Sequence, residues 1–223
     1  TRRAAISTIP VTRADCGLPD DAFVLANFNH PCKFEPGIFA VWMRLLRRLP
    51  RAVFWFGDWM HATRDHLRRE AEALGVDGSR LIFAKLEDHS RHLARLRLAD
   101  LALDNRFHGG GVTTVDALWA GLPTLTVAGD SPAARLGATL ASAAGMPELV
   151  MPDFEAYEAR AIELAENPGL LRDVRDKLWR QRTACALFNA EQYRRDLEQA
   201  YLAMWDNHVS GRGPRQIDIA ARP

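Results

Sequence analysis

Short apolar runs of strand length alternate with amphipathic segments of helical length over about 150 residues of the chain. The runs expected to form strands are residues 23–28, 53–56, 80–84, 101–103, 124–127 and 148–151. The segments expected to form helices lie between them, at residues 36–49, 61–74, 88–98, 113–120 and 132–144. This alternation is typical of βαβ units, whose parallel strands form a sheet covered by helices on both faces. The sequence therefore predicts an α/β fold built on a parallel sheet.

The pattern changes after residue 153, where helical segments follow one another without strands between them. Residues 154–166, 170–182 and 190–205 are expected to be helical, and the C-terminal tail is expected to be loose. A chain of 223 residues can bury a core without help from disulfide bonds or metals. We therefore expect one main domain over residues 1–207 and a tail over residues 208–223.

Composition and charge exclude several classes of protein. Apolar residues make up 48% of the chain and charged residues 26%, which rules out a disordered or collagen-like protein. The 29 Lys and Arg residues balance 28 Asp and Glu residues, so no basic excess attracts nucleic acid or an anionic membrane surface. No apolar run reaches the roughly 18 residues that a membrane helix needs. We expect neither nucleic acid nor a membrane as a partner.

The three cysteines, Cys16, Cys32 and Cys185, stand far apart and form no CxxC pair. An odd number at such spacings argues against a disulfide framework or a structural zinc site and fits a reducing cytoplasm. The first residues lack the apolar stretch of a signal peptide. Because the chain does not begin with Met, we expect a piece of a longer protein or a processed product.

A glycine-rich loop, Gly109–Gly111, follows the fourth predicted strand and leads into a helix that is expected to begin at Thr113 or Thr114. In an open parallel sheet, ligands bind beyond the carboxyl ends of the strands. Glycines let the backbone approach a ligand, and free amides at a helix start attract an anion, most simply a phosphate. A flexible turn capped by Thr113 is the alternative. The loop is neither a Walker A loop nor a dinucleotide-binding fingerprint, because the required Lys-Ser or Lys-Thr and the earlier glycines are missing.

Other side chains follow strands at the same predicted edge. Lys33 comes after the first strand and could pair with a phosphate, although a solvated loop lysine is the alternative. His92 and Arg95 share a helix face, where an imidazole and a guanidinium suit a nucleobase better than zinc; an ordinary polar surface helix is the alternative. Asp116 could accept hydrogen bonds from ribose hydroxyls or interact with the helix dipole.

Together these motifs resemble one known family. They are Gly17-Leu-Pro, Phe28-Asn29, Lys33, His92 with Arg95, Leu98-Ala-Asp100, Thr113-Thr114 with Asp116, Trp119-Ala-Gly-Leu-Pro123 and, further on, Leu187-Phe-Asn189 and Met204-Trp205. They look like the C-terminal catalytic half of O-linked N-acetylglucosamine transferases, with bacterial and SPINDLY-like members nearest in appearance. The resemblance extends over about residues 11–207.

The resemblance implies a Rossmann-like domain, the donor-binding second half of a GT-B glycosyltransferase, whose C-terminal helices pack back on a first half absent from this chain. It implies an inverting transfer of N-acetylglucosamine from UDP-GlcNAc to Ser or Thr hydroxyls of proteins, without a metal or other cofactor. It also implies upstream tetratricopeptide repeats and a chain that is inactive by itself. Two hypotheses stay open beside it: a protein O-fucosyltransferase that uses GDP-fucose, and a nucleotide-sugar-binding module without turnover.

The resemblance implies a role for each residue on the phosphate side of the donor. Lys33 would contact the diphosphate and act in catalysis. The amides of Gly111, Val112 and Thr113 would hold the β-phosphate. The remaining donor-site residues on this side would be Gly110, Thr114 and His30, the last standing where animal members have Gln.

Roles on the nucleoside side follow in the same way. His92 would stack on or border the uracil, with Arg95 beside the base. Asp116 would take the ribose hydroxyls. Glu87 and His89 fall where the chain approaches uracil and ribose.

Overall fold

The computed structural model describes residues 5–58 and 60–219, and its centre is a six-stranded parallel sheet with the order β3-β2-β1-β4-β5-β6. The strands are β1 (Phe23–Asn27), β2 (Ala52–Gly57), β3 (Leu81–Ala84), β4 (Leu101–Leu103), β5 (Thr124–Val127) and β6 (Val150–Met151). This order is that of a Rossmann-like doubly wound sheet, so the predicted fold class is confirmed. The last strand is shorter than expected because residues 147–149 form a 3-10 turn before it.

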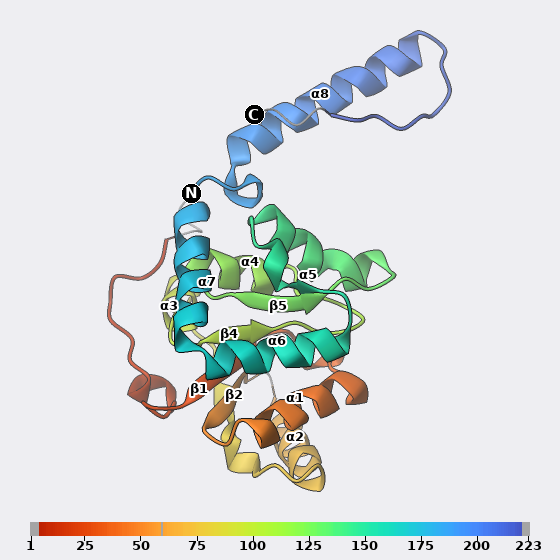
Figure 1. The fold of residues 1–223 in the computed structure, drawn as a ribbon. Helices are drawn as coiled ribbons and strands as arrows, with labels where there is room; N and C mark the ends of the chain where they lie inside the picture. The colour runs from red at the N-terminus through yellow and green to blue at the C-terminus, as the bar shows by residue number, and fades with distance from the viewer. Residues whose placement is uncertain (1–4, 59, 220–223) are drawn as a thin grey trace.

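Helices cover both faces of the sheet (Figure 1). They are α1 (Pro36–Arg48), α2 (His61–Ala73), α3 (His89–Leu96), α4 (Val112–Ala120), α5 (Pro132–Ala143), α6 (Phe154–Glu166), α7 (Pro168–Gln181) and α8 (Ala190–Val209). Helix α1 forms where Glu35 accepts the amides of Gly37 and Ile38, both at 2.7 Å, with Pro36 in the first turn. The eight helices of the described residues lie where the sequence predicts them, with ends that differ by a few residues.

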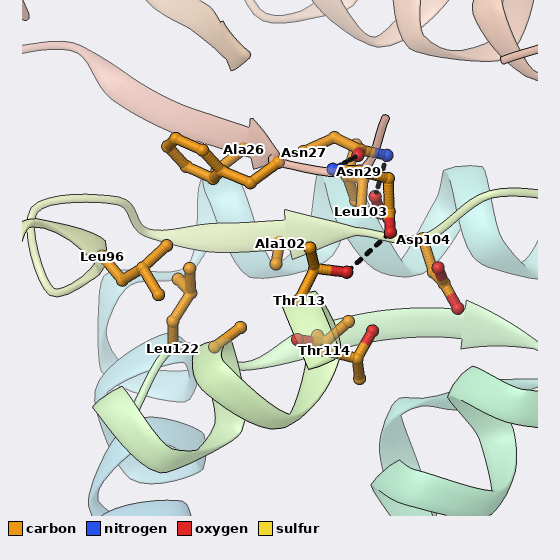
Figure 2. Close-up of a pocket in the computed structure, with 13 residues that line it drawn as sticks. Ala26, Asn27, Asn29, Leu96, Ala102, Leu103, Asp104, Thr113, Thr114 and Leu122 are labelled. Atoms are coloured by element: carbon orange, nitrogen blue, oxygen red, sulfur yellow. Dashed lines mark hydrogen bonds between the residues drawn. The ribbon is translucent and has the colours of Figure 1, made fainter. Parts of the chain in front are cut away.

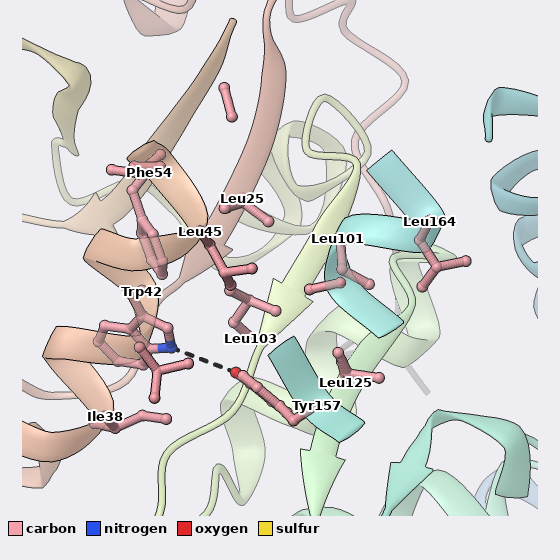
Figure 3. Packing of buried hydrophobic residues seen from close by; sticks show 14 of the residues in the cluster. Leu25, Ile38, Trp42, Leu45, Phe54, Leu101, Leu103, Leu125, Tyr157 and Leu164 are labelled. Atoms are coloured by element: carbon pink, nitrogen blue, oxygen red, sulfur yellow. Dashed lines mark hydrogen bonds between the residues drawn. The ribbon is translucent and has the colours of Figure 1, made fainter. Parts of the chain in front are cut away.

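Neighbouring strand residues point to opposite faces and build two separate apolar layers. Leu25 packs with α1 and α6 on one face, whereas Val24 and Ala26 pack with α3 and α4 on the other. Figure 3 shows the first layer, where Trp42 of α1 donates a hydrogen bond to the Tyr157 hydroxyl of α6 at 3.4 Å. Burial on both faces explains why the strands read as continuous apolar runs rather than alternating ones.

The C-terminal part of the chain differs from the body. Helix α8 projects away from the sheet and its covering helices (Figure 1). It continues to Val209, so the non-helical tail begins after the expected boundary at residue 208. On α8, Tyr201 is 60% exposed and Trp205 63% exposed, so this helix presents large apolar side chains to solvent.

The structure bears on two expectations, one about the cysteines and one about membrane-spanning helices. Cys16, Cys32 and Cys185 are all free thiols in the structure. Among residues 5–58 and 60–219, every helix is too short or too polar to span a bilayer.

Candidate functional site

The centre of the site is the switch point of the sheet, between β1 and β4. Strands β2 and β3 lie on the far side of β1, and β5 and β6 lie on the far side of β4, so the loops that leave these two strands diverge. A crevice opens there, outside the carboxyl ends. Figure 2 shows Asn27 and Asn29 at the end of β1, Asp104 at the end of β4, and Thr113 and Thr114 at the start of α4 around it.

The Asp104 carboxylate fixes the conformation of the glycine loop through hydrogen bonds to its backbone. It is 2% exposed, and its Oδ1 accepts the amides of Asn105 at 2.9 Å and Gly110 at 2.8 Å. Its Oδ2 accepts the Thr126 hydroxyl at 2.9 Å. Burial raises the pKa of the Asp104 carboxyl, and these donors with the Lys33 ammonium oppose that shift. The loop is therefore held in one shape by a buried acid on the neighbouring strand.

Gly110 lies where no side chain fits. A Cβ there would overlap the Thr114 hydroxyl and would stand 2.8 Å from the Thr113 hydroxyl. Since its amide is already bonded to Asp104, Gly110 contributes space to the loop and no free donor. The backbone amides that remain free to bind an anion therefore begin at Gly111.

Helix α4 begins at Val112, earlier than predicted, and the alternative of a flexible turn capped by Thr113 is wrong. The N-cap is Gly111, which has no side chain to bond the first turn, and the Thr113 hydroxyl instead donates to Asn29 Oδ1 at 2.6 Å. Val112 is 74% exposed. The first-turn amides and the positive end of the helix dipole are thus left without a side-chain cap at the open edge of the crevice.

Lys33 links the loop after β1 to the glycine loop. It ends the short 3-10 turn η3 (Pro31–Lys33), and its Nζ donates to the Gly109 carbonyl at 3.2 Å. The structure therefore brings the predicted cation and the predicted phosphate loop together. His30 is exposed at the start of the same turn and lines a different groove, of about 540 Å³, between α1 and α2.

The nucleoside-side residues line a cleft of about 240 Å³ beside the crevice. Its lining residues come from the ends of β1, β2 and β3, from α3 and from the first turns of α4. They are Phe28, Gly57, Asp58, Ala84, Leu86, Glu87, His89, His92, Arg95, Thr113 and Asp116. Five predicted nucleoside-side residues and Thr113 therefore share one cavity.

Arg95 and His92 form the buried wall of this cleft. The Arg95 guanidinium is 5.3 Å from the Phe28 ring centroid and 5.9 Å from that of Trp55, and it donates to the Lys85 carbonyl. Its Nε donates to His92 Nδ1 at 3.1 Å. Burial, followed by the charges of Arg95 and His89, lowers the pKa of His92 to about 4.

The polar side chains at the rim of the cleft form hydrogen bonds and ion pairs with other side chains of the protein. His89 Nε2 lies 3.0 Å from Asp116 Oδ1, and Glu87 bonds to Arg91 at 3.1 Å. The Asp116 carboxylate is therefore already engaged by His89. In the part of the chain that the structure describes, no group of three or more His, Cys, Asp or Glu side chains is placed to hold a metal ion.

Several residues that shape the site were given no role from the sequence. Asn29 is 5% exposed and Asp104 2% exposed; Asp104 directly follows the fully buried strand β4, and Asn29 lies two residues after the end of β1. A polar residue placed directly after an apolar strand was the available signal, because burial of such a group requires hydrogen-bond partners. Trp55 also had no role assigned from the sequence, although its ring lies against the Arg95 guanidinium.

Comparisons with known proteins agree with this geometry. A model of glycosyl transferase family 41 matches residues 2–197. A UDP-N-acetylglucosamine–peptide N-acetylglucosaminyltransferase of Caenorhabditis elegans is 33% identical over 205 residues, which are 92% of this chain and 18% of that protein. The probable enzyme of the same description named SEC, from Arabidopsis thaliana, is 34% identical and matches 93% of this chain and 21% of its own length.

A solved structure matches as well. A mutant of the O-GlcNAc transferase of Thermobaculum terrenum superposes with a TM-score of 0.77 and 30% identity, over 85% of this chain and 39% of that one. The chain therefore spans about a fifth of the length of these curated relatives and well under half of the solved enzyme.

Proposed function

The chain belongs to glycosyl transferase family 41, and from this premise we propose that it supplies the donor site of an inverting protein O-GlcNAc transferase. In this proposal, the enzyme moves N-acetylglucosamine from UDP-GlcNAc to Ser or Thr hydroxyls of proteins. The observation that carries it is the meeting of Lys33, the glycine loop and the uncapped start of α4 beside a nucleoside-sized cleft.

The diphosphate would lie against the first turn of α4. As the bond between the sugar C1 and the phosphate oxygen breaks, negative charge grows on the leaving UDP. The amides of Gly111, Val112 and Thr113 and the Lys33 ammonium would stabilise that charge, which a fixed set of donors does without reorganisation. Lys33 would exchange the Gly109 carbonyl for a phosphate oxygen, and this exchange needs only a turn of its long side chain.

The nucleoside would fill the cleft with its uracil against His92 and Arg95 and its ribose hydroxyls toward Asp116. A cavity of about 240 Å³ accommodates a group of this size. Contact of the base with the side chains of Phe28 and His92, whose ring centroids lie 5.0 Å apart in an edge arrangement, would add affinity. Glu87 and His89 would border the base and the ribose from the polar rim.

The acceptor hydroxyl would come from outside this chain. We propose that an upstream GT-B half, preceded by tetratricopeptide repeats, supplies the acceptor side and covers the apolar residues of α8. The exposure of Tyr201 and Trp205 supports this, as does the small share of the relatives that the chain spans. The chain alone would bind the donor without turnover. Three free thiols support a reducing, cytoplasmic location.

Donor binding by the 223-residue chain tests the proposal. Isothermal titration with UDP, UDP-GlcNAc and GDP-fucose should show binding of the two uridine ligands, weakened by Lys33→Ala and by Asp116→Asn. Lys177→Ala is the matched control, because Lys177 pairs with Glu148 at 2.6 Å and lies outside the cleft. Preference for GDP-fucose would overturn the assigned donor, and equal binding by all variants would overturn the assigned site.

A further inference from the structure

We infer that Arg95 is a positioning residue that fixes the tautomer of His92, so that the imidazole presents an Nε2–H donor to the cleft. The inference rests on the proposed function for the identity of the ligand, whereas the tautomer itself depends only on contacts within the chain. Arg95 thereby acts on the bound nucleotide through a second side chain.

The hydrogen bond between the two residues has one possible direction. A guanidinium has N–H donors and no acceptor, so the 3.1 Å contact requires a lone pair on His92 Nδ1. A ring nitrogen with a lone pair carries no proton. The neutral imidazole must then hold its proton on Nε2. Within residues 5–58 and 60–219 no acceptor bonds to that nitrogen, and the ring lines the cleft.

Arg95 cannot turn away from this contact without losing others. It is 6% exposed, donates to the Lys85 carbonyl, and lies over the rings of Phe28 and Trp55. These contacts hold the guanidinium on several sides. The orientation of the donor to His92 is therefore determined by packing rather than by the hydrogen bond alone.

The charged groups around His92 favour its neutral form. Its own helix contributes Arg95 and His89, both of which oppose a second positive charge. The carboxylates that line the cleft come from other elements and are engaged elsewhere: Glu87 with Arg91, Asp116 with His89, and Asp58 at 4.0 Å from Arg64. Cys16, near Arg95, bears a thiol whose pKa is raised by burial, so it adds no anion at neutral pH.

This arrangement has a functional consequence. A neutral Nε2–H donor suits a carbonyl oxygen of a nucleobase, and it keeps the same hydrogen-bonding pattern over the physiological pH range. Without Arg95, the imidazole could exchange tautomers, and the loss of the neighbouring positive charge would raise its pKa, which burial would still hold below the ordinary value. Affinity for the base would then depend on pH.

Histidine-selective ¹⁵N labelling of the 223-residue chain tests this, because the chain has only seven histidines. Long-range ¹H–¹⁵N spectra from pH 4 to 8 should show an unprotonated Nδ1 and a protonated Nε2 for His92, with no titration above pH 5.5. A protonated Nδ1, or titration near pH 6.5 in the wild-type chain, would overturn the inference. This measurement needs no variant and does not depend on ligand binding.

The variant Arg95→Met keeps apolar bulk over Phe28 and removes the donor. It should give a mixture of tautomers, raise the titration midpoint of His92 above that of the wild-type chain, and weaken UDP binding roughly tenfold, with a stronger dependence on pH. Arg97→Met is the matched control, since Arg97 ends the same helix but lies over Trp179. Unchanged His92 signals in a folded Arg95→Met chain would contradict the inference. A chain with the predicted tautomer that fails to bind UDP would overturn the donor assignment instead.

Discussion

Replacing Gly110 by Ala tests whether the shape of the glycine loop is set by the space at this one position. The new Cβ would overlap the Thr114 hydroxyl, and Thr114 is only 3% exposed, so that side chain has little room to move. The same atom would stand 3.2 Å from Asn29 Nδ2. The loop must shift instead, and the shift would strain the 2.8 Å bond from the Gly110 amide to Asp104.

The magnitude follows from these two effects. Overpacking of a tight site costs about 1–3 kcal/mol, and weakening a hydrogen bond to a buried carboxylate costs about 1.5–3 kcal/mol. Because the loop can relax partly, we expect a loss of about 2–4 kcal/mol in the free energy of unfolding. For a domain of this size the melting temperature should fall by roughly 5–15 °C. Displaced amides at the start of α4 should also weaken UDP binding by at least about tenfold.

Thermal unfolding and UDP titration measure the two effects separately. Gly169→Ala is the control, because a Cβ there meets no atom within 4 Å, and it should leave both quantities near those of the wild type. The double variant Gly110→Ala, Thr114→Ala removes the overlapped hydroxyl and should recover about half of the lost stability. A single Gly110→Ala variant with wild-type melting and affinity would refute the reasoning, as would a double variant that is less stable than the single one.

Four further predictions concern catalysis, metals, pH and association. Lys33→Ala in the intact enzyme should lower the transfer rate by roughly 10²–10³ with the fold unchanged, and a rate within about threefold of the wild type would contradict its assignment. EDTA should leave UDP-GlcNAc turnover by the intact enzyme unchanged. Activity that is lost on chelation and restored by Mg²⁺ or Mn²⁺ would show that the transfer needs a metal ion. Since the pKa of His92 is about 4 in the folded chain and near 6.5 when unfolded, the unfolded state binds the proton first as pH falls. The free energy of unfolding should therefore drop by about 3 kcal/mol between pH 6.5 and 4, and urea unfolding of His92→Gln should lack this drop. The isolated chain should self-associate as its concentration rises and bind a hydrophobic dye through Tyr201 and Trp205 of α8, and a clean monomer without dye signal in sizing chromatography would argue against an uncovered helix.

The fold could be predicted from the sequence because the two periodicities of strand and helix are local properties. Residues 36–48 show this well: the apolar spacing, the capping acid at Glu35 and the closing Pro50 all lie within one segment. The start of α4 could not be predicted in the same way. Sequence rules favour Thr as a cap, yet the Thr113 hydroxyl bonds to Asn29, a residue 84 positions away. A contact at that separation leaves no trace in a local pattern.

The site residues likewise fall into those that the topology could place and those whose contacts depend on packing between distant segments. Lys33 and the glycine loop could be placed at one edge of the sheet from topology alone, because parallel strands end at the same side. That Lys33 donates to Gly109, and that the Gly110 amide is taken by Asp104, depended on side-chain packing. Residue types and loop positions thus identify the phosphate region, whereas the list of donors that remain free needs the structure.

Asp104 raises the question of why a buried acid lies beneath a loop proposed to bind an anion. Its carboxylate orients the Gly110 amide and the Thr126 hydroxyl, but its negative charge would repel a diphosphate above it. The Lys33 ammonium opposes this repulsion, since it lowers the pKa of Asp104 against the larger effect of burial. Lys33 would therefore serve the diphosphate directly and also offset the acid that shapes the loop. Without Lys33, the Asp104 carboxylate and the diphosphate would repel each other with no cation between them. The loss of Lys33 should therefore weaken diphosphate binding more than the loss of one exposed phosphate contact would.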